Sequence, residues 1–181
     1  EKIQKATLCH PVDDERIIGW QATVWLEILQ NFNWNIDFVI CPIGWGGLVS
    51  WIISVFENLS KNTKVIWVEP AWAVCMKNSL ESNEIKTLEK IDTFVDGAAV
   101  KTPWTNNFKI AKNYNLKVFS CPENRVCSTM IDYLKEEWIV LEPAWALSTD
   151  VLKDNEVKEM IKWKNVVLIT SWWNFDFERL P

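Results

Sequence analysis

Short apolar runs alternate with helical stretches along the chain, and this alternation restricts the possible fold more than any other feature. Four runs have the length and character of buried strands, at residues 37–42, 64–69, 116–121 and 165–171. Helices are predicted at residues 16–31, 48–59, 73–82 and 123–136. Strands separated by helices are typical of parallel βαβ units whose sheet is covered on both faces. We therefore expect an α/β fold with a mostly parallel sheet flanked by helices.

The size and composition indicate one globular domain. A chain of 181 residues can bury a sizeable core, and no linker or internal repeat divides it. The longest irregular stretch, residues 86–103, is expected to lie on the surface. The net charge of -5 argues against a nucleic-acid partner. No apolar run approaches the roughly 20 residues of a membrane-spanning helix, so no membrane partner is expected.

The five cysteines are interpreted as reduced thiols of a cytoplasmic protein. Their number is odd, and no Cys-x-x-Cys pair occurs. A zinc site is disfavoured because His10 is the only histidine. The same count argues against a Ser-His-Asp triad.

A glycine-rich turn follows the first predicted strand. The residues are Gly44, Trp45, Gly46, Gly47 and Leu48, and a predicted helix begins at the last of them. Free backbone N–H groups and the helix dipole favour an anion at such a place. Glycine permits close approach of the backbone and left-handed dihedral angles. The pattern predicts an anion site, and the alternative is a tight turn that binds nothing.

Two further features of the sequence bear on a ligand site. Ser171 places a hydroxyl at the carboxyl end of the last predicted strand, where parallel sheets bind ligands. The phrase Glu-Pro-Ala-Trp-Ala occurs twice, at residues 69–73 and 142–146. Each copy alone is also explained by a strand-to-helix turn with proline near the helix start. Ser171 alone is equally explained as a polar residue at a strand end.

Together these features resemble the threonine dehydratases of the fold-type-II pyridoxal-phosphate (PLP) family. The ending SWWNFDFERLP is similar to the SGGNFDFERLP of the biosynthetic branch. The other matching stretches are residues 10–15, 39–48, 65–76, 92–100, 126–130, 139–147 and 164–170. The resemblance implies that residues 1–181 form the C-terminal, large part of the catalytic domain, with the large subdomain of the tryptophan-synthase-β-like fold. The lysine-bearing N-terminal segment and the ACT-like regulatory domain are expected to lie outside it.

The resemblance also implies the cofactor, its contacts and the reaction. Backbone amides of residues 44–48 would hold the PLP phosphate, Ser171 would bond the pyridine nitrogen, and Glu142 would lie near the ring. The reaction would be deamination of L-threonine to 2-oxobutanoate and ammonia, the first step of isoleucine biosynthesis. The implied partners are L-threonine or L-serine and, because the family forms tetramers, further copies of the chain. A serine dehydratase or racemase and a non-catalytic fragment are the alternatives.

The sequence departs from the family in its lysine and metal motifs. No Ser-x-Lys-x-Arg-Gly-Ala motif occurs, so no lysine is assigned as the Schiff-base residue, and the chain alone is expected to be inactive. Some relatives bind a divalent metal through a glutamate, a carbonyl and an aspartate. Glu69 and Ala73 match the first two, but Cys75 replaces the aspartate. A thiol is a poor ligand for Mg²⁺ or Ca²⁺, so no such metal site is expected.

The tryptophans are the sharpest departure. The chain has 13 tryptophans and 5 glycines, whereas glycine usually makes up about 7% of residues. The tryptophans that stand at glycine positions of the family are Trp20, Trp45, Trp51, Trp67, Trp72, Trp138, Trp145, Trp163, Trp172 and Trp173. One hypothesis is that the source organism decodes UGA as glycine, while a conventional translation writes tryptophan. The alternative is that the tryptophans are real and that Trp45 places an indole in the anion site.

Overall fold

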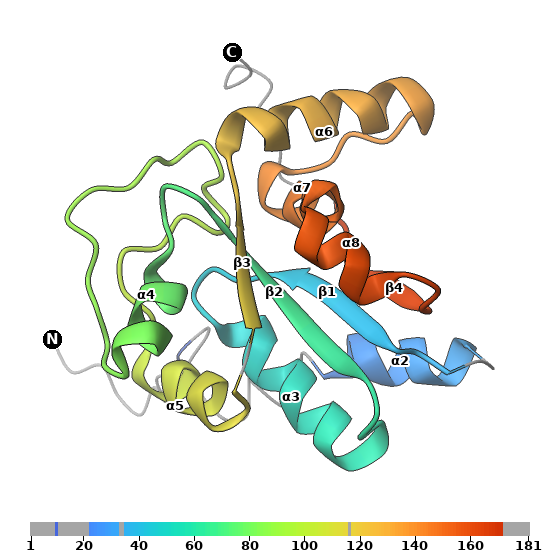
Figure 1. Cartoon of the computed structure of the whole chain (residues 1–181), viewed down its shortest axis with the longest axis horizontal. Helices are drawn as coiled ribbons and strands as arrows, with labels where there is room; N and C mark the ends of the chain where they lie inside the picture. Colours follow the sequence, from blue (N-terminus) through green and yellow to red (C-terminus); the bar gives the residue numbers. More distant parts are fainter. Residues whose placement is uncertain (1–9, 11–21, 33–34, 116, 172–181) are drawn as a thin grey trace, which may run out of the picture.

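A parallel four-stranded sheet forms the centre of the molecule (Figure 1). The computed structural model describes residue 10 and residues 22–32, 35–115 and 117–171. The strands are β1 (Phe38–Pro42), β2 (Lys64–Pro70), β3 (Lys117–Cys121) and β4 (Val166–Leu168). Their order is β3-β2-β1-β4, and every neighbouring pair is parallel. The predicted α/β class and the four predicted strands are confirmed, although β4 is shorter than the run at residues 165–171.

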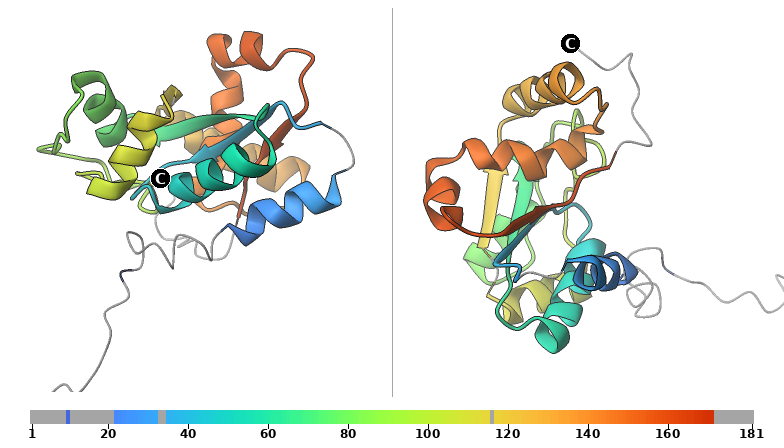
Figure 2. Two further views of the ribbon diagram at one scale, coloured as in Figure 1. Left: turned by 90° about the horizontal axis from the view of Figure 1, so that it is seen from below. Right: turned by 90° about the vertical axis from the view of Figure 1, so that its right-hand side faces the viewer.

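Helices cover both faces of this sheet (Figure 2). One face carries α2 (Thr23–Asn31), α3 (Gly47–Leu59), α4 (Cys75–Ser82) and α5 (Thr105–Asn113). The other carries α6 (Glu123–Glu136), α7 (Pro143–Asp150), the short 3-10 helix η1 (Val151–Lys153) and α8 (Asn155–Ile161). In the part of the chain that the structure covers, no helix has the length and apolar character needed to cross a membrane.

The central strand β1 shows why its sequence is apolar throughout. Successive side chains of a strand point to opposite faces of the sheet. Phe38 and Ile40 join the core under α6 and α7, while Val39 and Cys41 join the core under α2 and α3. Because both faces are covered, every residue of β1 is buried. A fully buried strand gives the continuous apolar run by which the sequence predicted it.

The helices were predicted less completely than the strands. The prediction for α6 is confirmed at both ends, whereas α4 begins at Cys75 and not at residue 73. Neither α5 nor α8 was predicted, because their polar sequences carry only a short apolar stripe. Residues 16–21 of the first predicted helix, and the characteristic ending at residues 172–181, lie outside the described residues.

Residues 86–103 contain no helix or strand, as predicted, but the expectation that they lie on the surface is wrong for four of them, since Pro103 is buried together with the three residues that follow here. Val95, Ala98 and Val100 are 1–2% exposed. Val95 and Ala98 pack against the core under α6 and α7. This stretch therefore crosses the carboxyl end of the sheet and closes part of the core.

Candidate functional site

A hollow of about 260 Å³ lies at the carboxyl end of β1, the edge where parallel sheets bind ligands. Its wall is formed by the loop at residues 42–48, by Gly97 and Ala98, and by Glu142, Ala144 and Trp145 at the start of α7. The structure thus brings together six of the residues predicted as cofactor contacts, namely Gly44, Trp45, Gly46, Gly47, Leu48 and Glu142. Their contact with a cofactor stays a prediction.

Two glycines of the loop meet steric demands that no other residue satisfies. A Cβ on Gly44 would lie 2.8 Å from the carbonyl oxygen of Gly97. Gly46 has a φ of 88°, and a Cβ there would lie 2.6 Å from the Cβ of Asn107. The prediction of left-handed dihedral angles is confirmed at Gly46, whereas the close approach found at both glycines is to Gly97 and Asn107, and approach to an anion stays a prediction.

Two buried polar side chains hold the loop from behind. The amide of Asn107 on α5 donates to the carbonyl of Trp45 at 2.9 Å. The hydroxyl of Ser50 on α3 lies 2.6 Å from Oδ1 of Asn107 and 3.1 Å from the carbonyl oxygen of Gly46. These contacts fix two loop carbonyls against side chains that do not line the hollow. Sequence analysis missed both residues, because nothing in the pattern brings α5 beside this loop.

The first turn of α3 gives this wall of the hollow a positive potential. The helix begins at Gly47 and runs for 13 residues, so its aligned peptide dipoles end at the loop. Its N-cap residue, Gly46, offers no side-chain acceptor, and the first turn contains no acidic residue. The amide N–H groups at a helix start are left without partners inside the helix. Such a place binds phosphate or carboxylate groups.

Glu142 contributes a carboxyl group to the opposite wall. Partial burial raises its pKa, and the carboxylate of Asp96 raises it further. A Cβ on Gly97 would lie 2.7 Å from Oε1 of Glu142, so this carboxyl packs directly against the Gly97 backbone. Ser171 does not line the hollow, but its carbonyl oxygen accepts the N–H of Glu142 at 3.2 Å. The last predicted site residue therefore adjoins the site through its backbone, and the role of its hydroxyl stays a prediction.

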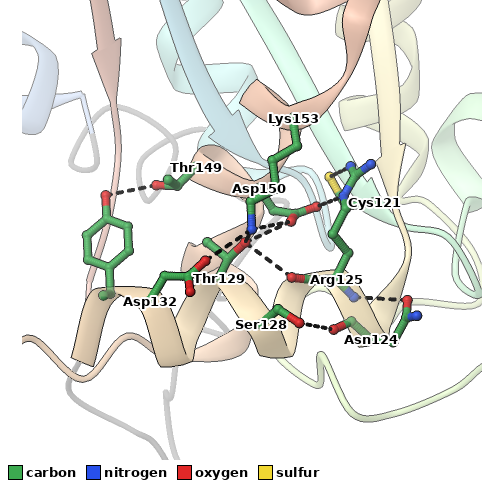
Figure 3. Close-up of polar contacts among 10 residues, drawn as sticks. Cys121, Asn124, Arg125, Ser128, Thr129, Asp132, Thr149, Asp150 and Lys153 are labelled. Atoms are coloured by element: carbon green, nitrogen blue, oxygen red, sulfur yellow. Dashed lines mark hydrogen bonds and ion pairs between the residues drawn. The ribbon is translucent and has the colours of Figure 1, made fainter. Parts of the chain in front are cut away.

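A buried carboxylate fixes the helix whose start forms this wall (Figure 3). Asp150, the last residue of α7, is fully buried and accepts from Nε of Arg125 at 2.7 Å and from the Thr129 hydroxyl at 2.8 Å. Nη2 of Arg125 also lies 3.5 Å from Sγ of Cys121 at the end of β3. The cluster joins α6, α7 and β3. Sequence analysis missed it, because a single aspartate in a short helix carries no pattern.

The first Glu-Pro-Ala-Trp-Ala copy, at residues 69–73, contains a buried glutamate that does not line the hollow. Glu69 is 1% exposed and accepts the N–H groups of Met76 at 2.8 Å and Lys77 at 3.0 Å. Burial raises its pKa to about 7, although these hydrogen bonds oppose the shift. Burial, and next the charge of Glu69, raise the pKa of Cys75 to about 12.

No group of three acidic, histidine or cysteine residues is placed to hold a metal within the described ranges. The lack of a divalent site at Glu69 and Cys75 stays a prediction.

The sequence comparisons match almost the whole chain. The family model for pyridoxal-phosphate-dependent enzymes matches residues 1–171. The biosynthetic L-threonine dehydratase of Halalkalibacterium halodurans is 40% identical over 176 residues, which cover 97% of this chain and 42% of that protein. The corresponding protein of Bacillus subtilis is 37% identical over 177 residues, which cover 98% of this chain and 42% of that protein. This chain thus spans less than half the length of these two relatives.

Solved structures agree with the sequence matches. The processed form of threonine deaminase isoform 2 from Solanum lycopersicum superposes with a TM-score of 0.87 and 30% identity, covering 95% of this chain and 50% of that one. The serine racemase of Dictyostelium discoideum gives 0.82 and 30%, covering 94% and 54%. The resemblance to biosynthetic threonine dehydratases is confirmed. The chain belongs to the family of pyridoxal-phosphate-dependent enzymes.

Proposed function

We propose that this chain forms the cofactor-holding part of an ammonia-lyase that converts L-threonine to 2-oxobutanoate and ammonia in isoleucine biosynthesis. The observation that supports it most is the glycine loop at the start of α3, which lines a hollow at the carboxyl end of β1. The relatives with 37–40% identity are named biosynthetic L-threonine dehydratases.

The loop fits the phosphate of PLP in shape and in charge. Gly44, Gly46 and Gly47 line the hollow and carry no side chain, so the main chain itself borders it there. The start of α3 supplies the positive potential that a phosphate requires. We propose that amides of residues 44–48 hold the phosphate, and that Asn107 and Ser50 keep the loop in shape.

The remaining predicted contacts concern the ring of the cofactor. PLP, when bound, supplies an electron sink for the electron pair released at the substrate Cα. We propose that the Ser171 hydroxyl bonds the pyridine nitrogen, where a neutral serine stabilises a pyridinium less than a carboxylate does. Glu142 would lie near the ring, in surroundings that already disfavour its negative charge.

No lysine is among the residues that line the hollow in the described structure. The family's Ser-x-Lys-x-Arg-Gly-Ala motif does not occur in these 181 residues, and we propose that the Schiff-base lysine lies outside them. We expect the isolated chain to be inactive, and the complete protein to be a cytoplasmic self-associating enzyme. Its amino-acid substrate is L-threonine, with L-serine as the second candidate.

The serine alternative is favoured by one observation, the likeness to the serine racemase of Dictyostelium discoideum. The test is to express the full-length gene and follow 2-oxobutanoate from L-threonine beside pyruvate and D-serine from L-serine. We expect a higher kcat/KM for L-threonine. Turnover of serine alone would replace the proposal with the alternative. If the Gly44→Val variant kept its activity, the assignment of this loop to the phosphate would be refuted. Ser128→Ala, on the exposed face of α6, is the matched control.

A further inference from the structure

Two tryptophans have backbone conformations that bulky residues rarely adopt. Trp138 has a φ of 57° and Trp163 a φ of 61°. The other described residues with positive φ are Gly46, Asn83 and Asn115. Glycine and asparagine are the residue types that tolerate this region, because a larger side chain crowds the following carbonyl. Tryptophan is therefore the exception at two of five such positions.

Trp138 follows α6 in the same way that Asn115 follows α5. The residue after α6, Glu137, has φ and ψ of -112° and -6°, and the residue after α5, Tyr114, has -81° and -3°. A left-handed residue comes next in both cases. Helices commonly end in this way, with glycine or asparagine at the left-handed position. The backbone after α6 thus has the form that glycine or asparagine normally adopts.

Trp163 occupies the third position of a type II turn. Lys162 has φ and ψ of -57° and 124°, and the N–H of Lys164 donates to the carbonyl of Ile161 at 3.0 Å. The third residue of this turn type needs a positive φ, which glycine supplies. This second position is independent of the first, since it belongs to a different kind of turn.

No packing compensates for the strain at either position. Trp138 is 87% exposed and Trp163 is 94% exposed. Trp25 shows the contrast, because it is fully buried and its ring lies 5.2 Å from that of Phe56. Trp25 thus has the ring contacts of a core tryptophan, although its buried indole N–H has no hydrogen-bond partner among the described residues. The other two have the backbone of glycine and exposed side chains.

Trp45 brings the question to the candidate site by its position alone, because its φ is not positive and its ring lies 6.1 Å from that of Trp104. It stands between Gly44 and Gly46, is 48% exposed, and lines the hollow described above. It also lines a second, mostly apolar hollow of about 440 Å³ beside residues 99–104. With glycine at position 45, the loop would have four glycines in succession. Both hollows would then lose the indole that lines them.

We propose that the source organism decodes UGA as glycine, so that positions 45, 138 and 163 carry glycine in the protein that the cell makes. The count of 13 tryptophans against 5 glycines agrees with this. Trp25 keeps the ordinary codon, UGG. The consequence for the cofactor rests on the proposed function: glycine at position 45 removes a bulky side chain that lines the hollow beside the proposed phosphate loop.

The gene and the native protein test the proposal directly. We expect UGA codons at positions 45, 138 and 163, a UGG codon at position 25, and tandem mass spectra of the native protein with glycine at the first three positions. UGG at position 138 or 163, or tryptophan in those peptides, would overturn it. Neither readout depends on PLP, so failure of the proposed function would leave this result standing.

Recombinant variants of the full-length protein give a second test. Trp138→Gly and Trp163→Gly together are expected to raise the melting temperature, while the matched control Trp25→Gly lowers it. A lower melting temperature for the double variant would contradict the proposal. Trp45→Gly is expected to lower the Kd for PLP, followed by absorbance. An unchanged Kd with UGA at position 45 would count against the PLP loop and not against the decoding.

Discussion

The two Glu-Pro-Ala-Trp-Ala copies have the same sequence and different structures. The first copy ends β2, where Pro70 pairs with Cys121 of β3, and the chain then makes a turn. The second begins α7, with Pro143 as the first helical residue. The carboxyl group of Glu69 is buried under α4, whereas that of Glu142 faces the hollow. Five residues therefore do not determine their own conformation or their role.

Hydrogen bonds to distant residues account for the difference. In the first copy, the N–H of Ala71 donates to the Cys121 carbonyl at 2.9 Å, and that of Trp72 to the Glu123 carboxylate at 2.9 Å. In the second, the N–H of Ala146 donates to the Glu142 carbonyl at 3.1 Å and starts a helix. The strand β3 lies beside the first copy only, so the two copies satisfy their backbone groups in different ways.

The largest effect is expected from a substitution that releases α7 from α6. Asp150→Ala is expected to lower the free energy of unfolding by about 3 kcal/mol, because it leaves Arg125 and Thr129 without their buried acceptor. Chemical denaturation measures the loss, and hydrogen exchange should accelerate in α7 before α4. Equal acceleration in both helices would show that the cluster does not hold α7 specifically. Glu136→Ala, at an exposed carboxylate of the same helix α6, is the control.

The next test compares the two glutamates directly. Glu69→Ala is expected to cost about 2 kcal/mol, since two backbone N–H groups at the start of α4 lose their acceptor. Glu142→Ala should cost less than about 1 kcal/mol, because this side chain is partly exposed and makes no capping hydrogen bond, although Glu142 is the N-cap residue of α7. Denaturation curves of both variants decide it. A larger loss of unfolding free energy for Glu142→Ala than for Glu69→Ala would mean that Glu142, and not Glu69, has the structural role.

The pH dependence of stability gives a third test, which concerns the buried carboxyl group of Glu69. The pKa of Glu69 is raised to about 7 in the folded chain from an ordinary value of 4.5, so the folded state holds this proton more tightly than the unfolded state. The stabilisation that this group contributes is fully present below about pH 4.5. It is lost as the pH rises through about 7, by at most about 1.4 kcal/mol per pH unit. Glu69→Gln should flatten this slope in denaturation measured from pH 5 to pH 8. An unchanged slope would contradict the raised pKa.

The smallest expected effect comes from the prolines. Pro143→Ala should cost about 0.5 kcal/mol, mainly because alanine gives the unfolded chain more freedom. Pro70→Ala should have a similar effect, since the same reason applies to both copies. Thermal denaturation of the two variants measures it. A difference of more than about 2 kcal/mol between them would mean that proline itself separates the two structures.

The sequence predicted the features that depend on repeated local patterns. Strand β1 is apolar along its whole length because both of its faces are buried, and the glycines of the loop stand where side chains would clash. Asn107 and Asp150 gave no such signal. Each is a single polar residue in a helix, and its role depends on a partner 57 or 25 residues away. Only the folded chain shows that these partners meet.

The order of the strands has a consequence for synthesis. The first and last strands of the described residues, β1 and β4, are neighbours in the sheet, and Asn165 donates its side-chain amide to the carbonyl of Asn35, 130 residues earlier. While a ribosome is still adding the intervening residues, β1 has β2 as its one neighbour and an open edge. Such long-range pairing forms slowly. The nascent chain therefore has to keep this edge from aggregating until residues 166–168 have emerged.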